Sequence, residues 1–420
     1  MTEPVVSVLG NGLRVVSAAM PSLETAAVGV WVEAGARHEP AALNGISHLL
    51  EHMAFKGTQR RSALAIAEEI ETVGGHLNAY TSREHTAYVA RVLKEDVPLA
   101  VDILADILQH ATMPVDELAR EREVVIQEIA QVHDTPDDVV FDIFQETAFP
   151  DQPLGRSILG TARRVASFDR DSLVAYMAEN YTADRLVLAA AGRVDHAALV
   201  ALAEDAFGGL RRGDGRAVAP ARYCGGDARE ARDLEQAHLV LGFSGVAYED
   251  PAFFDQQVLA TALGGGMSSR LFQEVREKRG LAYSIYAYAS SYRDAGLFVI
   301  YAGTGDEHLA ELVPVICDET CKCAEGIDDA EIDRARAQLK ASLLMSLESP
   351  SARCEQAARH LLIFGRVMPT AEIIERIDAV DARGLAATAR RLIAEGPPTV
   401  TALGPVAGLA PYEAIAARLG

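Results

Sequence analysis

Two histidines and a glutamate lie within five consecutive residues, His48-Leu49-Leu50-Glu51-His52. The apolar pattern around them predicts a helix over Asn44–Phe55. Residues four apart on a helix lie one above the other, so both imidazoles can bind the same metal ion, as tetrahedral zinc requires. Glu51 is one step from His52 and can reach a water on that metal without being a ligand. The segment therefore predicts half of a zinc site with a base beside it.

Two histidines do not complete a zinc site, so a further ligand must come from elsewhere in the chain. An acidic helical segment beginning at Val115 offers four glutamates, at positions 117, 121, 123 and 128. Glu121 and Glu128 are seven residues apart and share one helix face. Such an acidic run is usually a solvated face. Here the apolar residues of 124–129 predict a largely buried helix, and carboxylates on a buried helix need a partner.

His48-x-x-Glu51-His52, followed after 76 residues by Glu128, resembles the pitrilysin/insulinase family of inverted HxxEH zinc metallopeptidases. The chain length and the stretch Leu263–Phe272 (LGGGMSSRLF) are similar to its short-chain branch, which contains the mitochondrial processing peptidase. The resemblance implies one Zn²⁺ per chain, held by His48, His52 and Glu128. It also implies that Glu51 is the general base that activates the zinc-bound water, and that Glu121 orients a ligand histidine.

The second half of the chain departs from the metal-binding pattern. At an offset of 214 residues, the positions that match Glu121 and Glu128 are Ala335 and Ser342, so this half is predicted to bind no metal. It does carry Arg276 and Tyr283, which are similar to the pair that active family members bring to the substrate carbonyl. An arginine and a phenol there would stabilise the developing oxyanion. Without the resemblance, a surface arginine and a core tyrosine would be an equally good interpretation.

The segment His76–Thr81 alternates as an edge strand would. In the family that it resembles, the matching segment receives the substrate as an added strand, a mode that tolerates many sequences. Asn78 and Ala79 are therefore candidate substrate contacts. The alternative is that both are ordinary sheet residues.

The elements that position these residues recur in the two halves. Buried strands are predicted at 26–33 and 237–242, and acid-capped helices begin near residues 115 and 329. Further helices are predicted over 62–73 and 97–110. We expect an α+β fold of two homologous domains from an internal duplication, each a mostly antiparallel sheet packed with helices. The predicted division is a zinc-binding domain 1–210, a Gly/Arg-rich linker 211–233 and a metal-free domain 234–420 that carries the Arg/Tyr pair.

Composition narrows the range of partners. The 420 residues carry a net charge of −21, which disfavours nucleic acid and anionic membranes and would attract cationic peptides, although acidity can also serve solubility alone. No apolar run is long enough to span a bilayer, and the first residues do not resemble an export signal. Five cysteines form no disulfide framework, which predicts a reducing compartment such as the cytoplasm.

These observations predict a zinc metalloendopeptidase that hydrolyses short or unfolded polypeptides in an enclosed chamber. The resemblance implies a dimer, either a homodimer or a heterodimer with a paralogue, in which the Arg/Tyr pair completes the site. The alternative is a non-catalytic scaffold or assembly subunit of the same fold. Gly264–Gly266 lacks the Lys-Ser/Thr of a phosphate-binding loop, and Cys317, Cys321 and Cys323 are interpreted as reduced helix cysteines rather than a soft-metal site.

Overall fold

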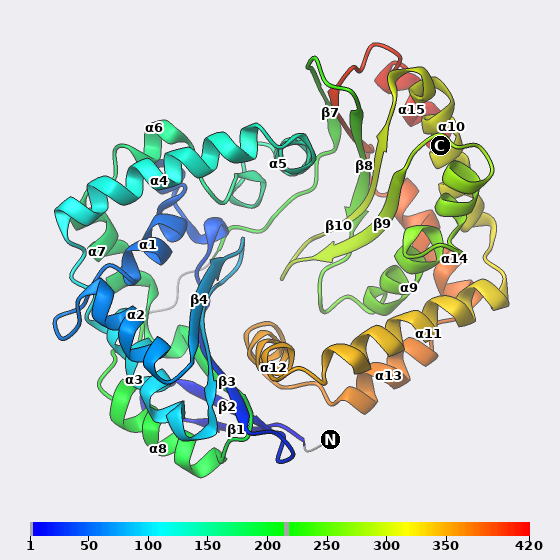
Figure 1. Ribbon diagram of the computed structural model, residues 1–420. Coiled ribbons are helices and arrows are strands. Elements are labelled where there is room, and N and C mark those ends of the chain that lie inside the picture. Colours follow the sequence, from blue (N-terminus) through cyan, green and yellow to red (C-terminus); the bar gives the residue numbers. More distant parts are fainter. Residues whose placement is uncertain (1–2, 214–217) are drawn as a thin grey trace. The chain divides into compact units, whose positions relative to one another are not determined.

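The computed structural model describes residues 3–213 and 218–420 and divides into two compact units, each of which is considered by itself (Figure 1). Unit 1 comprises residues 1–130, 156–219 and 344–369, and unit 2 comprises residues 131–155, 220–343 and 370–420. None of the described helices is both long and apolar enough to cross a lipid bilayer.

Unit 1 is built on a six-stranded sheet in the order β1-β2-β6-β3-β5-β4. Its strands are β1 (Val5–Val8), β2 (Arg14–Ala19), β3 (Thr25–Val32), β4 (His76–Thr81), β5 (Thr86–Leu93) and β6 (Leu186–Gly192). The β2–β6 pair is parallel, and the remaining pairs are antiparallel. β3 is apolar on both faces because helices cover both. β4 lies at one edge of the sheet, as its alternating sequence predicts.

Alternate side chains of the central strand enter two different cores. Val28 and Val30 pack with helices α1 (Ile46–Ala54), α3 (Val97–Gln109), α7 (Arg170–Asn180) and α8 (His196–Phe207). Ala27 and Trp31 point to the opposite face and pack against α12 (Pro350–Phe364). Helices α2 (Ala63–Thr72), α4 (Val115–His133) and α6 (Ala162–Val165) complete the unit. The fold thus places α1 and α4, which carry the candidate ligands, on the same side of the sheet.

Unit 2 repeats the plan of unit 1. Its sheet runs β7-β11-β8-β10-β9, with β7 (Gly226–Ala231), β8 (Ala237–Gly245), β9 (Ser284–Ser291), β10 (Gly296–Thr304) and β11 (Thr399–Gly404). The first pair is parallel and the others are antiparallel, which matches β2-β6-β3-β5-β4 strand for strand. The predicted α+β fold and internal duplication are therefore confirmed. Its helices are α9 (Phe253–Gly264), α10 (Leu309–Glu325), α11 (Asp329–Ser346), α13 (Thr370–Asp378), α14 (Ala382–Ala394) and α15 (Tyr412–Leu419).

One helix from each half of the sequence packs on the sheet of the other half. Helix α5 (Pro136–Ala148) buries Val140 and Phe144 against the sheet of unit 2, whereas α12 buries Ala358 and Leu361 against the sheet of unit 1. The compact units therefore differ from the predicted division 1–210 and 234–420, because apolar contacts do not follow chain order. The predicted linker 211–233 contains a strand, β7, and its residues 214–217 lie outside the described residues, as do residues 1–2.

Candidate active site

Helix α1 separates its apolar from its polar side chains. Ile46, Leu49, Leu50 and Met53 are fully buried in the core of unit 1, while His48, Glu51 and His52 remain partly exposed. The helix begins at Gly45, whose φ of +99° suits glycine. A Cβ at this position would lie 2.6 Å from the carbonyl oxygen of Leu159, so no other residue fits. Local sequence thus fixes both the start of α1 and the face that carries the polar groups.

The two histidines of α1 converge on Glu128 of α4. Nε2 of His48 lies 3.6 Å, and Nε2 of His52 lies 3.7 Å, from Oε2 of Glu128. The three ligand-type atoms all lie within 4.8 Å of one another. Zinc ligands at their usual bond lengths in a tetrahedral site are about 3.4 Å apart. The arrangement therefore fits a zinc ion with little adjustment.

The chemistry of the donor set also fits a metal. Burial, and secondarily the neighbouring His52, lower the pKa of His48 to about 4, so this imidazole is neutral near pH 7 as a ligand must be. The Glu128 side chain is 37% exposed, which leaves the group partly open to solvent. Two imidazoles and one carboxylate with an open position are typical of catalytic zinc sites.

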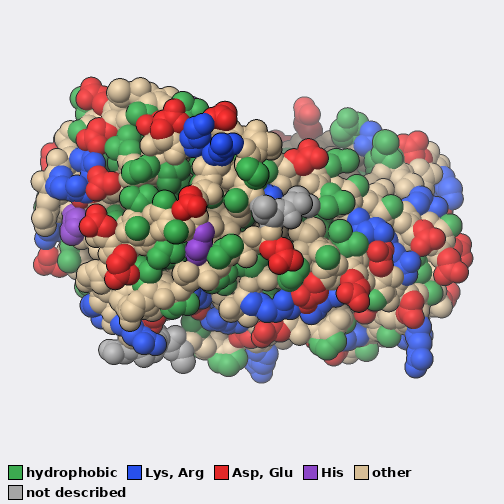
Figure 2. Space-filling model, turned by 90° about the horizontal axis from the view of Figure 1, so that it is seen from below, with side chains coloured by type: hydrophobic (Ala, Val, Ile, Leu, Met, Phe, Trp, Pro, Cys, Tyr) green, Lys and Arg blue, Asp and Glu red, His purple; other side chains and the backbone are tan. Residues whose placement is uncertain are grey.

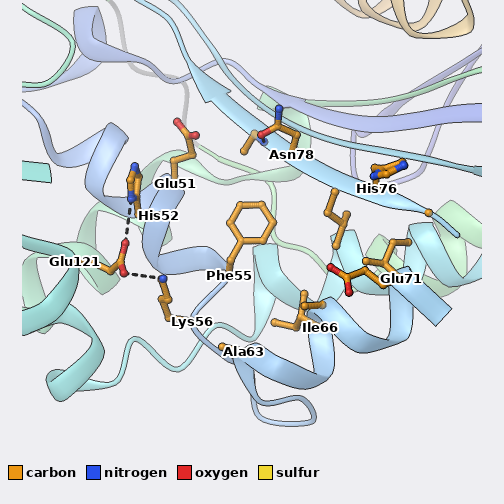
Figure 3. Close-up of a pocket in the computed structure, with 15 residues that line it drawn as sticks. Glu51, His52, Phe55, Lys56, Ala63, Ile66, Glu71, His76, Asn78 and Glu121 are labelled. Carbon is orange, nitrogen blue, oxygen red and sulfur yellow. Dashed lines mark hydrogen bonds and ion pairs between the residues drawn. The ribbon is translucent and has the colours of Figure 1, made fainter. Parts of the chain in front are cut away.

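Glu121, two turns before Glu128 on the same face of α4, is buried and contacts two groups of the α1 region. Its Oε2 lies 3.0 Å from Nδ1 of His52, and its Oε1 lies 2.6 Å from Nζ of Lys56 (Figure 3). A carboxylate on Nδ1 fixes the ring orientation and leaves Nε2 free for a metal. Sequence reasoning had found Glu121 but missed Lys56, although its position four residues after His52 was a usable signal.

Glu51 is held on the other side of α1 by the edge of the sheet. Thr81 of β4 donates its hydroxyl proton to Oε2 of Glu51 at 2.6 Å. Burial raises the pKa of Glu51, the bond from Thr81 and the charge of His52 oppose that rise, and Glu128 adds to it. A carboxylate whose pKa is raised is a better proton acceptor than an ordinary glutamate. Sequence reasoning missed Thr81, because the contact is long-range.

A pocket of about 440 Å³ opens beside Glu51 and His52. Figure 3 shows the ring of Phe55 in its centre, with α2 below and β4 above. Its wall is mixed: apolar side chains such as Ile66, Ile70 and Leu77 line it together with polar and charged ones such as Glu71 and His76. This pocket was not predicted, because its lining is drawn from α1, α2 and β4, which the sequence does not place relative to one another.

The candidate substrate contacts Asn78 and Ala79 both line this pocket from the edge strand β4. The side-chain oxygen of Asn78 accepts the backbone N–H of Ala79 at 2.9 Å. An incoming strand that used this N–H would have to displace the Asn78 side chain. The structure thus places both residues beside Glu51 on an unpaired sheet edge.

Arg276 and Tyr283 lie together in unit 2. Arg276 is on η6 (Phe272–Glu277), a π-helical turn, and donates from Nη1 to the carbonyl oxygen of Tyr283 at 3.0 Å. Its guanidinium carbon is 4.3 Å from the centre of the Tyr283 ring and 4.9 Å from that of Phe272. Tyr283 is 74% exposed, so the alternative of a core tyrosine is wrong.

Unit 2 has no counterpart of the metal centre in its described residues. Ala335 is buried on α11, where unit 1 has Glu121 on α4, and Ser342 lies on the same helix. Within residues 3–213 and 218–420, His48, His52 and Glu128 form the only close group of three metal-ligating side chains. All five cysteines are free thiols.

Comparison with known proteins agrees with this geometry. Residues 14–162 match the family model described as insulinase (peptidase family M16), and residues 167–339 match that of the peptidase M16 inactive domain. An uncharacterized zinc protease of Rickettsia felis is 42% identical over 92% of this chain and 94% of its own. A probable mitochondrial-processing peptidase subunit beta of Arabidopsis thaliana is 42% identical over 98% of this chain and 80% of its own.

Solved structures share the whole fold. A chain of complex III2 from Candida albicans superposes with a TM-score of 0.88 at 22% identity, covering 99% of both chains. The metal-ligand geometry, the duplicated fold and the two consecutive family matches lead to one assignment. The chain belongs to the insulinase family, peptidase family M16, and is a zinc metallopeptidase.

Proposed function

We propose that the protein is an endopeptidase that hydrolyses short or unfolded polypeptides. In this proposal His48, His52 and Glu128 hold the zinc ion, and Glu51 is the general base. The observation that carries it is the convergence of the Nε2 atoms of His48 and His52 on Glu128, at 3.6 and 3.7 Å. The helix of the two histidines also carries Glu51, which accepts the hydroxyl proton of Thr81.

Glu51 would accept a proton from water and later donate it to the leaving amine. A bound zinc ion supplies a Lewis acid that polarises the peptide carbonyl and acidifies water near neutral pH. Glu51 takes the proton from the attacking water while the new C–O bond forms. It then gives the proton to the leaving amine as the C–N bond breaks, which returns Glu51 to its carboxylate form. Thr81 keeps the base in place through both transfers.

The surroundings of Glu51 support a polypeptide substrate. The unpaired edge of β4, with Asn78 and Ala79, can bind an extended chain through its backbone, and the adjoining pocket of about 440 Å³ can take a large apolar side chain. Arg276 and Tyr283 present a guanidinium and an exposed phenol that suit a developing oxyanion. We propose that these two groups act in a dimer, and that the enzyme works in a reducing compartment such as the cytoplasm, because its five cysteines are free.

A non-catalytic assembly subunit is the alternative, and the likeness in fold to a chain of complex III2 favours it. Subunits of that kind need neither a metal nor a base. The intact set of ligand-type residues, with Glu121 and Thr81 supporting His52 and Glu51, favours the enzyme.

The decisive experiment compares Glu51→Gln with the wild type. The variant should bind zinc normally while turnover of an unstructured peptide falls by about 10²–10⁴-fold, because the ligands remain but the proton acceptor is lost. His48→Ala should instead lose zinc. Glu123→Gln, which alters an exposed carboxylate of α4 outside the pocket, is the control and should retain turnover. Near-normal turnover by Glu51→Gln would exclude the proposed base.

A further inference from the structure

Glu39 is a buried carboxylate outside the group of residues discussed so far. It follows the short 3-10 turn η1 (Ala36–His38) and is 3% exposed. Both of its carboxylate oxygens accept hydrogen bonds. Oε1 accepts the backbone N–H of Ser47 at 2.8 Å. Oε2 accepts the backbone N–H of Gly45 at 2.8 Å and the Nδ2 group of Asn44 at 3.0 Å.

These partners belong to the start of α1. The first N–H groups of a helix have no partner within the helix, and a residue at the N-terminal boundary usually provides a side-chain acceptor. Gly45 occupies that boundary and has no side chain to offer. Glu39 supplies the missing acceptor from six residues earlier. Burial raises the pKa of Glu39, and the hydrogen bonds that it accepts from Asn44, Ser47 and Gly45 oppose that rise. Ser47 is also held from the other side, by a 2.8 Å contact between its hydroxyl and that of Tyr176.

The start of α1 is next to the metal centre in sequence and in space. Ser47, whose N–H Glu39 accepts, is followed directly by His48, the third residue of the helix. His52 is one turn further along the same helix. A change in the position or rotation of the first turn therefore moves the His48 imidazole relative to His52 and Glu128.

We propose that Glu39 is a positioning residue of the metal centre: its two carboxylate oxygens fix the first turn of α1 and thereby hold His48 in the orientation that binds zinc. This inference rests on the proposed roles of His48 and His52. It assigns Glu39 no contact with metal or substrate.

Glutamine is the informative replacement, because it has nearly the same shape as glutamate but only one acceptor oxygen. In either orientation of the amide, its NH2 group would face an N–H donor, of Ser47 or of Gly45. One backbone N–H at the start of α1 would then lose its acceptor without a cavity being formed. Residues that orient metal ligands typically contribute about 10–100-fold to metal affinity.

The experiment measures the zinc dissociation constant of the full chain by competition with a chromophoric chelator, at a temperature where circular dichroism shows each variant folded. Glu39→Gln should bind zinc about 10–100-fold more weakly. Glu319→Gln is the control, because Glu319 is 6% exposed and ion-paired with Lys322 at 2.6 Å on α10 of unit 2. It should lower stability without changing zinc affinity.

A second readout separates positioning from a purely structural role. If Glu39 positions His48, zinc should raise the Tm of Glu39→Gln by less than it raises that of the wild type. A variant with lower Tm but unchanged zinc affinity and an unchanged zinc-induced shift would overturn the inference. Should Glu39→Gln not fold, Glu39→Asp, which keeps both oxygens but is one methylene shorter, must show the weakened affinity instead. Normal zinc binding by His48→Ala would refute the proposed ligand set, a result distinct from failure of the Glu39 inference.

Discussion

Oε2 of Glu121 lies 3.0 Å from Nδ1 of His52, on the opposite side of the ring from Nε2, which lies 3.7 Å from Oε2 of Glu128. One carboxylate thus fixes the imidazole, while another approaches the nitrogen that is free for a metal. Lys56, 2.6 Å from Oε1 of Glu121, restrains the first of these carboxylates from its far side. His52 is therefore supported by two charged groups in series, Glu121 and then Lys56, which lies two residues after the end of α1.

Replacing Glu121 with glutamine should weaken zinc binding by about 10–100-fold, because the His52 ring loses its charged partner. Chelator competition measures the affinity directly. Glu123→Gln is the matched control on the same helix, since Glu123 is exposed, and it should bind zinc as the wild type does. Equal affinities for both variants would show that Glu121 does not orient His52.

Filling the pocket beside Phe55 should change substrate preference. Ala67 lines the pocket from α2, and Ala67→Phe should lower kcat/KM about 10-fold or more for peptides that place a large apolar residue there, because a lost hydrophobic contact costs about 1–3 kcal/mol. Matched peptides with alanine at that position should be affected much less. Ala65→Phe, on the same helix but outside the pocket, serves as the control. Uniform loss for both peptides would indicate a damaged fold rather than a specificity pocket.

The net charge of −21 predicts a preference for cationic peptides. On the face seen in Figure 2, acidic side chains are interspersed with basic ones and form no single acidic patch. We therefore expect cationic peptides to be attracted at long range by the net charge of the chain. A Lys-rich peptide should be cleaved faster than its Glu-rich analogue at low salt. The ratio of kcat/KM values should shrink as the screening length falls to about 8 Å near physiological ionic strength. Equal rates at low salt would remove the charge argument.

Subunit complementation tests the proposed dimer. Inactive His48→Ala, changed in unit 1, is mixed with inactive Arg276→Ala, changed in unit 2, under conditions that exchange subunits. If a site combines the metal centre of one chain with the Arg/Tyr pair of another, a heterodimer contains one intact site, and peptidase activity should partly return. Exchange without any recovery would mean that each chain completes its own site. A paralogous partner would be needed only if the wild-type chain were inactive by itself.

His85 predicts a specific loss of stability in acid. Its Nε2 lies 3.3 Å from the Tyr80 hydroxyl and its Nδ1 lies 3.1 Å from that of Ser82. Burial, and secondarily Arg359, lower its pKa from 6.5 to about 4. Between these two pH values the unfolded chain takes up a proton at His85 that the folded chain does not, so the free energy of unfolding decreases as pH falls.

The measurement is chemical denaturation of zinc-free protein at several pH values. Wild type should lose stability from pH 6.5 down to about 4. His85→Gln keeps a polar side chain without a titrating group, so its curve should be flatter in that interval even if it lies lower at neutral pH. Parallel curves for the two proteins would show that His85 takes up its proton equally in both states.

The sequence was sufficient to predict helices whose positions are determined by neighbouring residues. The helix predicted over 44–55 is α1 at 46–54, and those predicted over 62–73 and 97–110 are α2 and α3 at 63–72 and 97–109, because periodic apolar residues specify each of them. The sequence was insufficient where contacts join distant segments. Thr81 on Glu51, Glu39 on the first turn of α1 and the pocket around Phe55 depend on strand and helix placement that periodicity does not encode.

The positions of α5 and α12 have a consequence for biosynthesis. The last strand of the unit 1 sheet, β6, ends at Gly192, but the helix that covers one face of that sheet ends at Phe364. While the intervening residues are still being translated, Trp31, Val187 and Ala189 remain without the apolar surface that later buries them. An exposed apolar sheet face on a nascent chain is prone to aggregation. The zinc-binding half is thus synthesised first, but its sheet is fully covered only after α12 has been translated. A chaperone that binds the emerging chain would encounter this half with one sheet face still exposed.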